Sequence, residues 1–174
     1  MKWFITFVDD STRMTWVYLL KLKSDVCAVY HLFHQMVLTQ FGRSIKIIRS
    51  DNGGEYFKNE LTDFLHSVDI IHQTSCSQYP QPNVVTERKN RHLLEVTRSL
   101  LLGGHVPSHL WGEALSSAVY LINRTPSSVL GFRRPLDALS DHCMLPSIVH
   151  LAPRVFGCVV YVHLYQNQRT KLEP

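Results

Sequence analysis

The sequence predicts an α/β protein in which a mixed β-sheet is flanked by helices on both faces. Two β-rich runs flank a short polar loop, and the chain then alternates between strand-like and helix-like patterns. A hairpin followed by β-α-β alternation needs both antiparallel and parallel pairing in one sheet. In such sheets, polar residues at strand ends and at neighbouring helix starts form the site. Asp51 and Glu87 have those positions.

The elements are expected from the spacing of apolar residues. Short β-branched and aromatic runs indicate strands, and apolar residues at i, i+3 and i+4 indicate helices. In chain order we expect strands at 3–8 and 14–20, a helix at 24–41, a strand at 45–48, a helix at 58–68, a strand at 69–74 and helices at 84–102 and 110–123. Gly42 is a natural stop for the first helix.

The chain after residue 125 has a different character. Prolines recur and periodicity is weak between residues 126 and 153, which predicts an irregular connector. Residues 154–164 are rich in β-branched and aromatic residues, which predicts a strand without an obvious partner in the last ten residues. We therefore divide the chain into a core at 1–125, a connector at 126–153 and the start of a second module at 154–174.

The composition is that of a folded protein with a mildly basic charge. The 174 residues are 45% hydrophobic and 18% charged, with a formal net charge of +4. This charge permits a nucleic-acid partner without demanding one. The sequence has no signal-peptide pattern and no apolar run long enough for a membrane span, so we expect an intracellular, nuclear or cytoplasmic protein. The four cysteines are widely spaced, which predicts reduced thiols and no zinc site.

Two carboxylates and three basic residues are the candidates for chemistry. Asp51 follows a predicted strand, Glu87 lies near the start of a predicted helix, and 35 residues separate them. Two magnesium ions about 4 Å apart can activate a nucleophile and stabilise the leaving oxygen of a phosphodiester. Such a pair of ions is usually held by three carboxylates. Arg88, Lys89 and Arg91 follow Glu87 and would meet the phosphates of a nucleic acid.

Each of these features alone also has a structural explanation. Asp51 fits an Asx turn, and Glu87 fits an acid favoured by the helix dipole. The three basic residues fit a solvated helix face, and Asp9 and Asp10 fit a hairpin loop. Only the joint pattern favours a metal site. Four histidines fit surface or core-edge positions better than metal ligation: His66, His72, His92 and His105.

Longer motifs carry a resemblance to a known family. The segments are residues 4–18, 48–56, 70–73, 87–95, 120–124 and 154–158. On these motifs the chain resembles the integrase core of copia-type LTR retrotransposon Pol polyproteins, especially those of plants. The resemblance implies a ribonuclease-H-like fold and the joining of element DNA to host DNA through two aspartates and a glutamate.

The resemblance assigns roles to individual residues. It places Asp51 at the second catalytic aspartate and Glu87 at the glutamate, both as ligands of magnesium or manganese. It also implies a homo-oligomer. Residues 154–158 look like the start of an SH3-like segment, hence a partial β segment at the C-terminus. The DNA-binding role of Arg88, Lys89 and Arg91 rests on their position after Glu87.

The chain departs from the family pattern in two places. The family's first catalytic aspartate lies on an earlier strand, so this sequence lacks that strand and holds no first catalytic Asp. Asp9 and Asp10 match the acidic turn after the next strand instead. Pro82, Val84 and Thr86 stand where the family usually has Gln, Gly and Ala, which should stiffen the loop before the glutamate.

These departures lead to the functional expectation. We expect a truncated integrase core, the remnant of a retrotransposon, that is catalytically inactive and keeps weak, non-specific DNA binding. One alternative is an active nuclease or strand transferase completed by an upstream chain. Another is a non-functional, poorly folded pseudogene product, because a missing strand exposes a sheet edge.

Overall fold

The structure is a computed structural model that describes residues 2–50, 58–74, 84–145 and 154–159. Along the chain its elements are β1 (Trp3–Val8), β2 (Thr15–Leu20), η1 (Lys23–Asp25), α1 (Val26–Phe41), β3 (Ile47–Ser50), α2 (Lys58–Ser67), β4 (Ile71–Thr74), α3 (Val84–Gly103), η3 (Ser108–Leu110), α4 (Trp111–Ile122), η4 (Ser128–Leu130) and α5 (Pro135–Ser140). The eight elements expected up to residue 123 are all present, each within two residues of its expected bounds.

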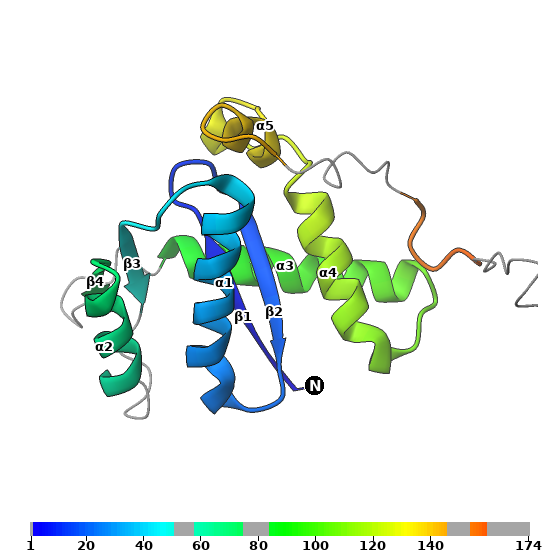
Figure 1. The fold of residues 1–174 in the computed structure, drawn as a ribbon. Helices are drawn as coiled ribbons and strands as arrows, with labels where there is room; N and C mark the ends of the chain where they lie inside the picture. The colour runs from blue at the N-terminus through cyan, green and yellow to red at the C-terminus, as the bar shows by residue number, and fades with distance from the viewer. Residues whose placement is uncertain (1, 51–57, 75–83, 146–153, 160–174) are drawn as a thin grey trace, which may run out of the picture.

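The hairpin of β1 and β2 is covered on one face by α1 (Figure 1). Aromatic rings make this contact: Phe33 of α1 stacks on Phe7 of β1 with centroids 4.1 Å apart, and Trp16 of β2 meets Phe33 edge-on at 5.4 Å. Such pairs add stabilisation to the burial of their area. α1 ends at Gly42, as expected, because a left-handed φ of 60° lets its N–H reach the carbonyl of Leu38.

The opposite face of the hairpin is covered by α3 and α4. Leu93 of α3 and Leu115 of α4 are fully buried in one cluster, and Phe4 of β1 packs against that cluster. Gly112 of α4 lies so close to β2 that an added Cβ would come within 2.7 Å of Leu19. Glycine therefore permits the close approach of helix and strand.

A second sheet holds β3 and β4, which pair in parallel. Tyr30 of α1 and Leu65 of α2 are buried in a cluster that also receives Phe7 of β1 and Ile48 of β3. The outer strands are β2 and β4, and β1 and β3 face each other under α1 (Figure 1). The chain thus combines antiparallel and parallel pairing in an α/β fold. Among the described residues the strands form two separate two-stranded sheets and not one continuous sheet.

The expectations for the C-terminal third need correction. The region expected to be an irregular connector contains η4 and α5, and Pro135 opens α5. Leu136 and Leu139 of α5 pack with Met14 beside β2, so packing continues past residue 125. Residues 154–159, expected to begin a strand, form none and turn at Gly157 with a φ of 82°. Residues 160–164 lie outside the described part, and the domain bounds themselves stay a prediction.

Candidate metal and nucleic-acid site

The first candidate acid, Asp51, comes directly after the last residue of β3. It belongs to residues 51–57, outside the part that the structure describes. Side chains of β3, the strand before Asp51, bind side chains of β4. The Ser50 hydroxyl lies 2.8 Å from Nε2 of His72 on β4. The Arg49 guanidinium donates to the Gln73 side chain on the same strand at 2.9 Å. His72 is thus a cross-strand partner at the core edge, as expected.

The second candidate acid, Glu87, lies in the first turn of α3 with an exposed side chain. Within the described ranges no group of three or more His, Cys, Asp or Glu side chains lies close enough to hold a metal ion. The described residues alone therefore do not provide the donor set that magnesium prefers. The proximity of Asp51 and Glu87 stays a prediction.

The three basic residues after Glu87 do not share one environment. Arg88 and Arg91 are exposed, whereas Lys89 is partly buried. Burial lowers the pKa of the Lys89 ammonium below its ordinary value, and the nearby positive charge of Arg13 lowers it further. Lys89 is therefore partly buried and near the positive charge of Arg13, whereas Arg88 and Arg91 lie on the solvent side of α3.

A hydrogen bond between α3 and β1 sets this rotation of the helix. The Thr6 hydroxyl of β1 donates to the side-chain oxygen of Asn90 at 2.7 Å. One turn further, Leu93 is fully buried between α3 and α4. Residues three apart lie on one helix face, so Asn90 and Leu93 define the inner face and fix which basic residues point outward.

The two acids of the hairpin loop have structural roles. Asp9 accepts hydrogen bonds from the backbone N–H of Thr12 at 2.8 Å and from its hydroxyl at 2.6 Å. Asp10 accepts from Arg13 at 2.7 Å and from Arg49 of β3 at 2.8 Å. The hydrogen bond from Arg49 lowers the pKa of Asp10, and the charge of Arg13 adds to this effect. Both acids serve the loop, which confirms the structural interpretation of this pair.

Sequence reasoning missed two contacts that shape the region. Arg49 was treated only as part of a strand, but it links β3 to the hairpin loop across 39 positions of sequence. Asn123 was quoted only within a family motif. Its side-chain amide accepts from the Thr15 N–H at 3.0 Å and donates to the Thr15 carbonyl at 2.7 Å. An asparagine at the very end of the helix predicted at 110–123 was the signal that the sequence offered for the second contact.

Solved structures identify the class of fold. The chain superposes on the catalytic core domain of HTLV-2 integrase in complex with magnesium, with a TM-score of 0.58 and 21% identity over 76% of this chain and 81% of that chain. It also superposes on a chain of the simian T-cell lymphotropic virus intasome in complex with PP2A regulatory subunit B56 gamma, with a TM-score of 0.64 and 19% identity over 90% of this chain and 58% of that one. The fold is that of a retroviral-type integrase catalytic core, which confirms the predicted ribonuclease-H-like class.

Sequence comparison identifies the family. Residues 1–80 match the model of the integrase core domain family. The chain is 43% identical over 172 residues to the retrovirus-related Pol polyprotein from transposon TNT 1-94 of Nicotiana tabacum, covering 99% of this chain and 13% of that protein. It is 40% identical to the Pol polyprotein from transposon RE2 of Arabidopsis thaliana, covering 99% and 11%. The chain is thus similar along nearly its whole length to segments of plant retrotransposon Pol polyproteins, and residues 1–80 match an integrase core domain, as its motifs predicted.

Two further facts bound this assignment. The chain spans 13% of the length of the TNT 1-94 polyprotein and 11% of the length of the RE2 polyprotein. In the described part of the chain, no helix is both long enough and apolar enough to cross a membrane.

Proposed function

We propose that this chain is a remnant of a retrotransposon integrase that binds DNA weakly and without sequence preference, and that it is catalytically inactive by itself. Its homology to retrotransposon Pol polyproteins along 99% of its length carries the proposal. The ancestral role of this family is DNA integration by metal-dependent phosphodiester strand transfer. Asp51 and Glu87 occupy two of the family's three acidic positions.

The donor set within residues 1–174 supports the proposal that these residues are inactive by themselves. When bound, the metal ions supply charge stabilisation at the attacking and leaving oxygens. Asp51 and Glu87 would be the ligands that this chain contributes to magnesium or manganese. Two carboxylates leave a two-ion site short of its usual third acid, and the described acids, histidines and cysteines do not converge elsewhere into a replacement.

The exposed face of α3 supports the proposed DNA binding. Arg88 and Arg91 are three residues apart, so they lie on one side of the helix and project into solvent. Arginine presents a planar group that pairs well with phosphate oxygens. Lys89 is turned inward and carries less of this role. Binding through two or three phosphate contacts is weak, salt-dependent and indifferent to base sequence.

The double variant Arg88→Ala/Arg91→Ala tests the DNA-binding face. We expect the slope of log K against log salt for a 20-base-pair duplex to become shallower by about 2, because each phosphate contact contributes about 0.9. The measurement is fluorescence anisotropy between roughly 50 and 200 mM salt.

A charge-matched double variant provides the control. Arg133→Ala/Arg134→Ala removes the same charge from exposed arginines that are already paired, with Asp141 at 2.7 Å and Asp137 at 2.6 Å. We expect its slope to stay close to that of the parent chain. Equal slopes of log K against log salt for all three proteins would show that α3 is not the DNA-binding surface.

A cleavage assay tests the proposed inactivity. We expect the 174-residue chain with magnesium or manganese to cut neither single-stranded nor duplex DNA above the metal-only background. Metal-dependent cutting that disappears in Glu87→Gln would instead support the alternative of an active nuclease or strand transferase. The DNA-binding measurement does not depend on cleavage. DNA binding can therefore still be tested if the cleavage assay contradicts the proposed inactivity, and the reverse also holds.

A further inference from the structure

Residues 154–159 lie against the C-terminal end of α3, beside the connection from α3 to η3 (Figure 1). One backbone hydrogen bond closes a turn inside this segment, from the Cys158 N–H to the Val155 carbonyl at 3.3 Å. Among the described residues no backbone hydrogen bond joins the segment to α3 or to the connection after it. What holds the segment in place is therefore found in the close contacts between the two backbones.

The end of α3 does not need a glycine at position 104. His105 takes the left-handed conformation with a φ of 51°, and its N–H donates to the Leu102 carbonyl at 3.3 Å. The Val106 N–H donates to the Leu101 carbonyl at 3.0 Å, which completes a Schellman motif. Glycine is the usual residue at the left-handed position of this motif, but Gly104 precedes that position and has no positive φ. Helix termination thus leaves Gly104 unexplained.

The approach of the segment explains both Gly104 and Gly157. A Cβ added to Gly104 would lie 3.3 Å from the Phe156 carbonyl oxygen, and a Cβ added to Gly157 would lie 3.0 Å from the Gly104 carbonyl oxygen. Each glycine therefore directs a Cα hydrogen toward a backbone carbonyl of the other segment. Such Cα–H···O contacts are individually weak. They require that neither residue carries a side chain, because a methyl group would push the two backbones apart.

Val106 is the third residue of this contact. Its Cγ2 atom would lie 3.2 Å from an added Cβ at Gly104 and also 3.2 Å from one at Gly157. The valine side chain therefore fills the corner between the two glycines. Because the Schellman motif fixes the Val106 backbone, the position of this side chain is set by α3 and not by the segment. Gly104, Val106 and Gly157 are called the glycine latch below.

The neighbouring glycine has open surroundings. Gly103 is the last residue of α3, and an added Cβ at this position would meet nothing within 4 Å. The close approach is thus specific to Gly104, although the two glycines are adjacent in sequence. Gly103 therefore provides a matched control for substitutions in the glycine latch.

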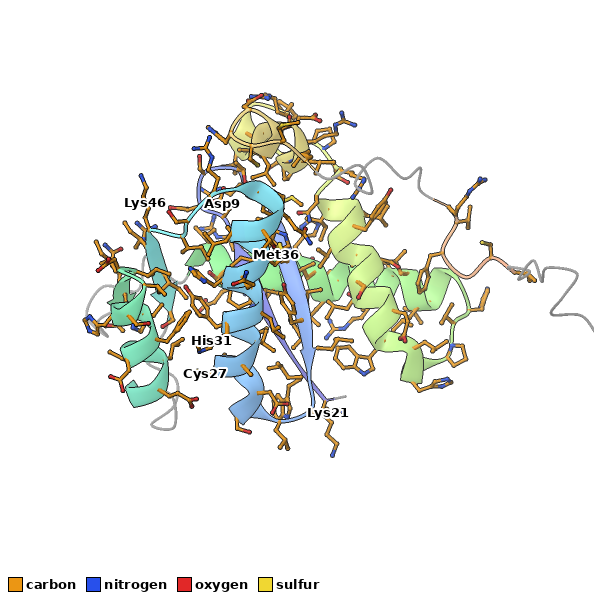
Figure 2. All side chains as sticks on the ribbon, viewed as in Figure 1. Asp9, Lys21, Cys27, His31, Met36 and Lys46 are labelled. Carbon is orange, nitrogen blue, oxygen red and sulfur yellow. The ribbon has the colours of Figure 1, made fainter. Side chains whose placement is uncertain are left out.

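The glycine latch lies at the end of α3 opposite to Glu87. Gly104 follows Glu87 by 17 positions, which corresponds to about 26 Å along the helix axis at a rise of about 1.5 Å per residue. Residues 154–159, drawn in orange, lie beside that far end (Figure 1). Figure 2 places Lys46, just before β3, on the opposite side of the molecule. The segment is thus held away from the first turns of α3, which carry the exposed Arg88 and Arg91.

We propose that residues 154–159 form a strap, which the glycine latch closes onto the end of α3 and which opens without unfolding of the core. Opening breaks no described hydrogen bond between strap and helix end. It also exposes little apolar area, because Phe156 is the one partly buried residue of the strap, whereas Val155 and Val159 are 79% and 78% exposed. The closed strap extends the folded core beyond residue 153. This inference goes beyond the proposed function and does not depend on DNA binding or catalysis.

Limited proteolysis with trypsin on the full 174-residue chain tests the strap. Arg154 is the basic residue of the strap, and its side chain is exposed. Trypsin needs a locally open backbone, so the rate of cleavage after Arg154 reports the open strap. We expect the parent chain to be cut there at least about tenfold more slowly than a synthetic peptide of residues 150–159. Cleavage after Arg98, within α3, is measured in the same samples and reports unfolding of the core.

Two substitutions disturb the glycine latch in opposite ways. Gly104→Ala adds a methyl group in the direction of the Phe156 carbonyl oxygen, and this group also lies 3.0 Å from the Leu100 carbonyl oxygen of α3 itself. Val106→Ala removes the methyl groups that fill the corner between the glycines and adds no atom. An effect common to both variants therefore comes from the strap contact and not from strain at the helix end.

The three variants should differ in one rate and agree in the other. We expect Gly104→Ala and Val106→Ala each to raise the rate of cleavage after Arg154 by about fivefold or more, toward the rate of the peptide. We expect Gly103→Ala to be cut after Arg154 like the parent chain. The rate after Arg98 should stay within about twofold of the parent rate in all three variants, because the core remains folded.

Three outcomes would overturn the proposal. Cleavage of the parent chain after Arg154 at the peptide rate would show that the strap is open in solution. Parent-like cleavage after Arg154 in both Gly104→Ala and Val106→Ala would show that the glycine latch does not hold it. A rate after Arg98 that rises in step with the rate after Arg154 would show that the strap opens only when the core unfolds.

Discussion

Replacing Leu93 by alanine is expected to lower the free energy of unfolding by about 3–4 kcal/mol. Leu93 is fully buried between α3, α4 and the hairpin, in contact with a cluster that includes Leu115 and Ile122. Alanine removes the transfer free energy of the lost side-chain carbons and leaves a cavity, because helices held on both sides relax only partly. In a chain of this size the loss corresponds to a drop of about 10 °C in Tm.

The control for this change lies on the same helix. Leu102 is 77% exposed, so Leu102→Ala has the same chemistry and helix propensity without a cavity. We expect it to change stability by less than about 0.5 kcal/mol. Urea unfolding followed by circular dichroism measures both variants. Equal effects at the two positions, or a non-cooperative melt of the parent chain, would mean that this core is not formed in solution and would favour the poorly folded alternative.

Long periodic patterns explain why most of the fold was predictable. α1 and α3 each extend over four or more turns, and the hairpin strands are continuous β-rich runs, so their local preferences agree with the packing that the structure describes. α5 was missed because six residues are too few to display a helical period, and Pro135 was interpreted as an interruption. At the first position of a helix proline is favoured, since the missing N–H has no partner there.

Residues 154–159, the described part of the strand predicted at 154–164, are not a strand for a different reason. β-branched composition describes a surface that fits a sheet, and it does not supply a neighbouring strand. In the described part of this segment, residues 154–159 have none. Gly157 instead approaches Gly104 beyond the end of α3, with an added Cβ reaching 3.0 Å from the Gly104 carbonyl oxygen.

The candidate site itself stays a prediction, and only the environment of the basic residues after Glu87 can be compared with the sequence. The spacing of basic residues after Glu87 was visible in the sequence, but the sequence pattern alone did not say that Lys89 turns inward. That depends on the phase of α3, which the contact between Thr6 and Asn90 sets across 84 positions of sequence. The link between Asp10 and Arg49 likewise depends on how two sheets lie in space. Tertiary contacts of this kind leave no local signal.

Replacing Asn123 by alanine is expected to cost about 2–4 kcal/mol, although the residue carries no charge and touches no candidate site. Asn123 is 3% exposed and follows α4. Its amide accepts from the Thr15 N–H at 3.0 Å and donates to the Thr15 carbonyl at 2.7 Å, as a neighbouring strand would. Alanine leaves two backbone groups of a buried strand residue without partners, and each unsatisfied group costs about 1–3 kcal/mol.

The substitution Asn123→Asp distinguishes lost hydrogen bonds from lost packing. An ionised carboxylate keeps an acceptor for the Thr15 N–H but faces the Thr15 carbonyl with a second acceptor, so we expect this variant to be less stable than Asn123→Ala at pH 7. Burial and the facing carbonyl raise the folded-state pKa of the new carboxyl above its unfolded value. The extra destabilisation is therefore absent below the unfolded pKa of about 3.9 and grows as pH rises toward the folded pKa. Urea unfolding of both variants at acidic and neutral pH measures this, and a pH-independent difference between them would show that Asn123 acts through its volume alone.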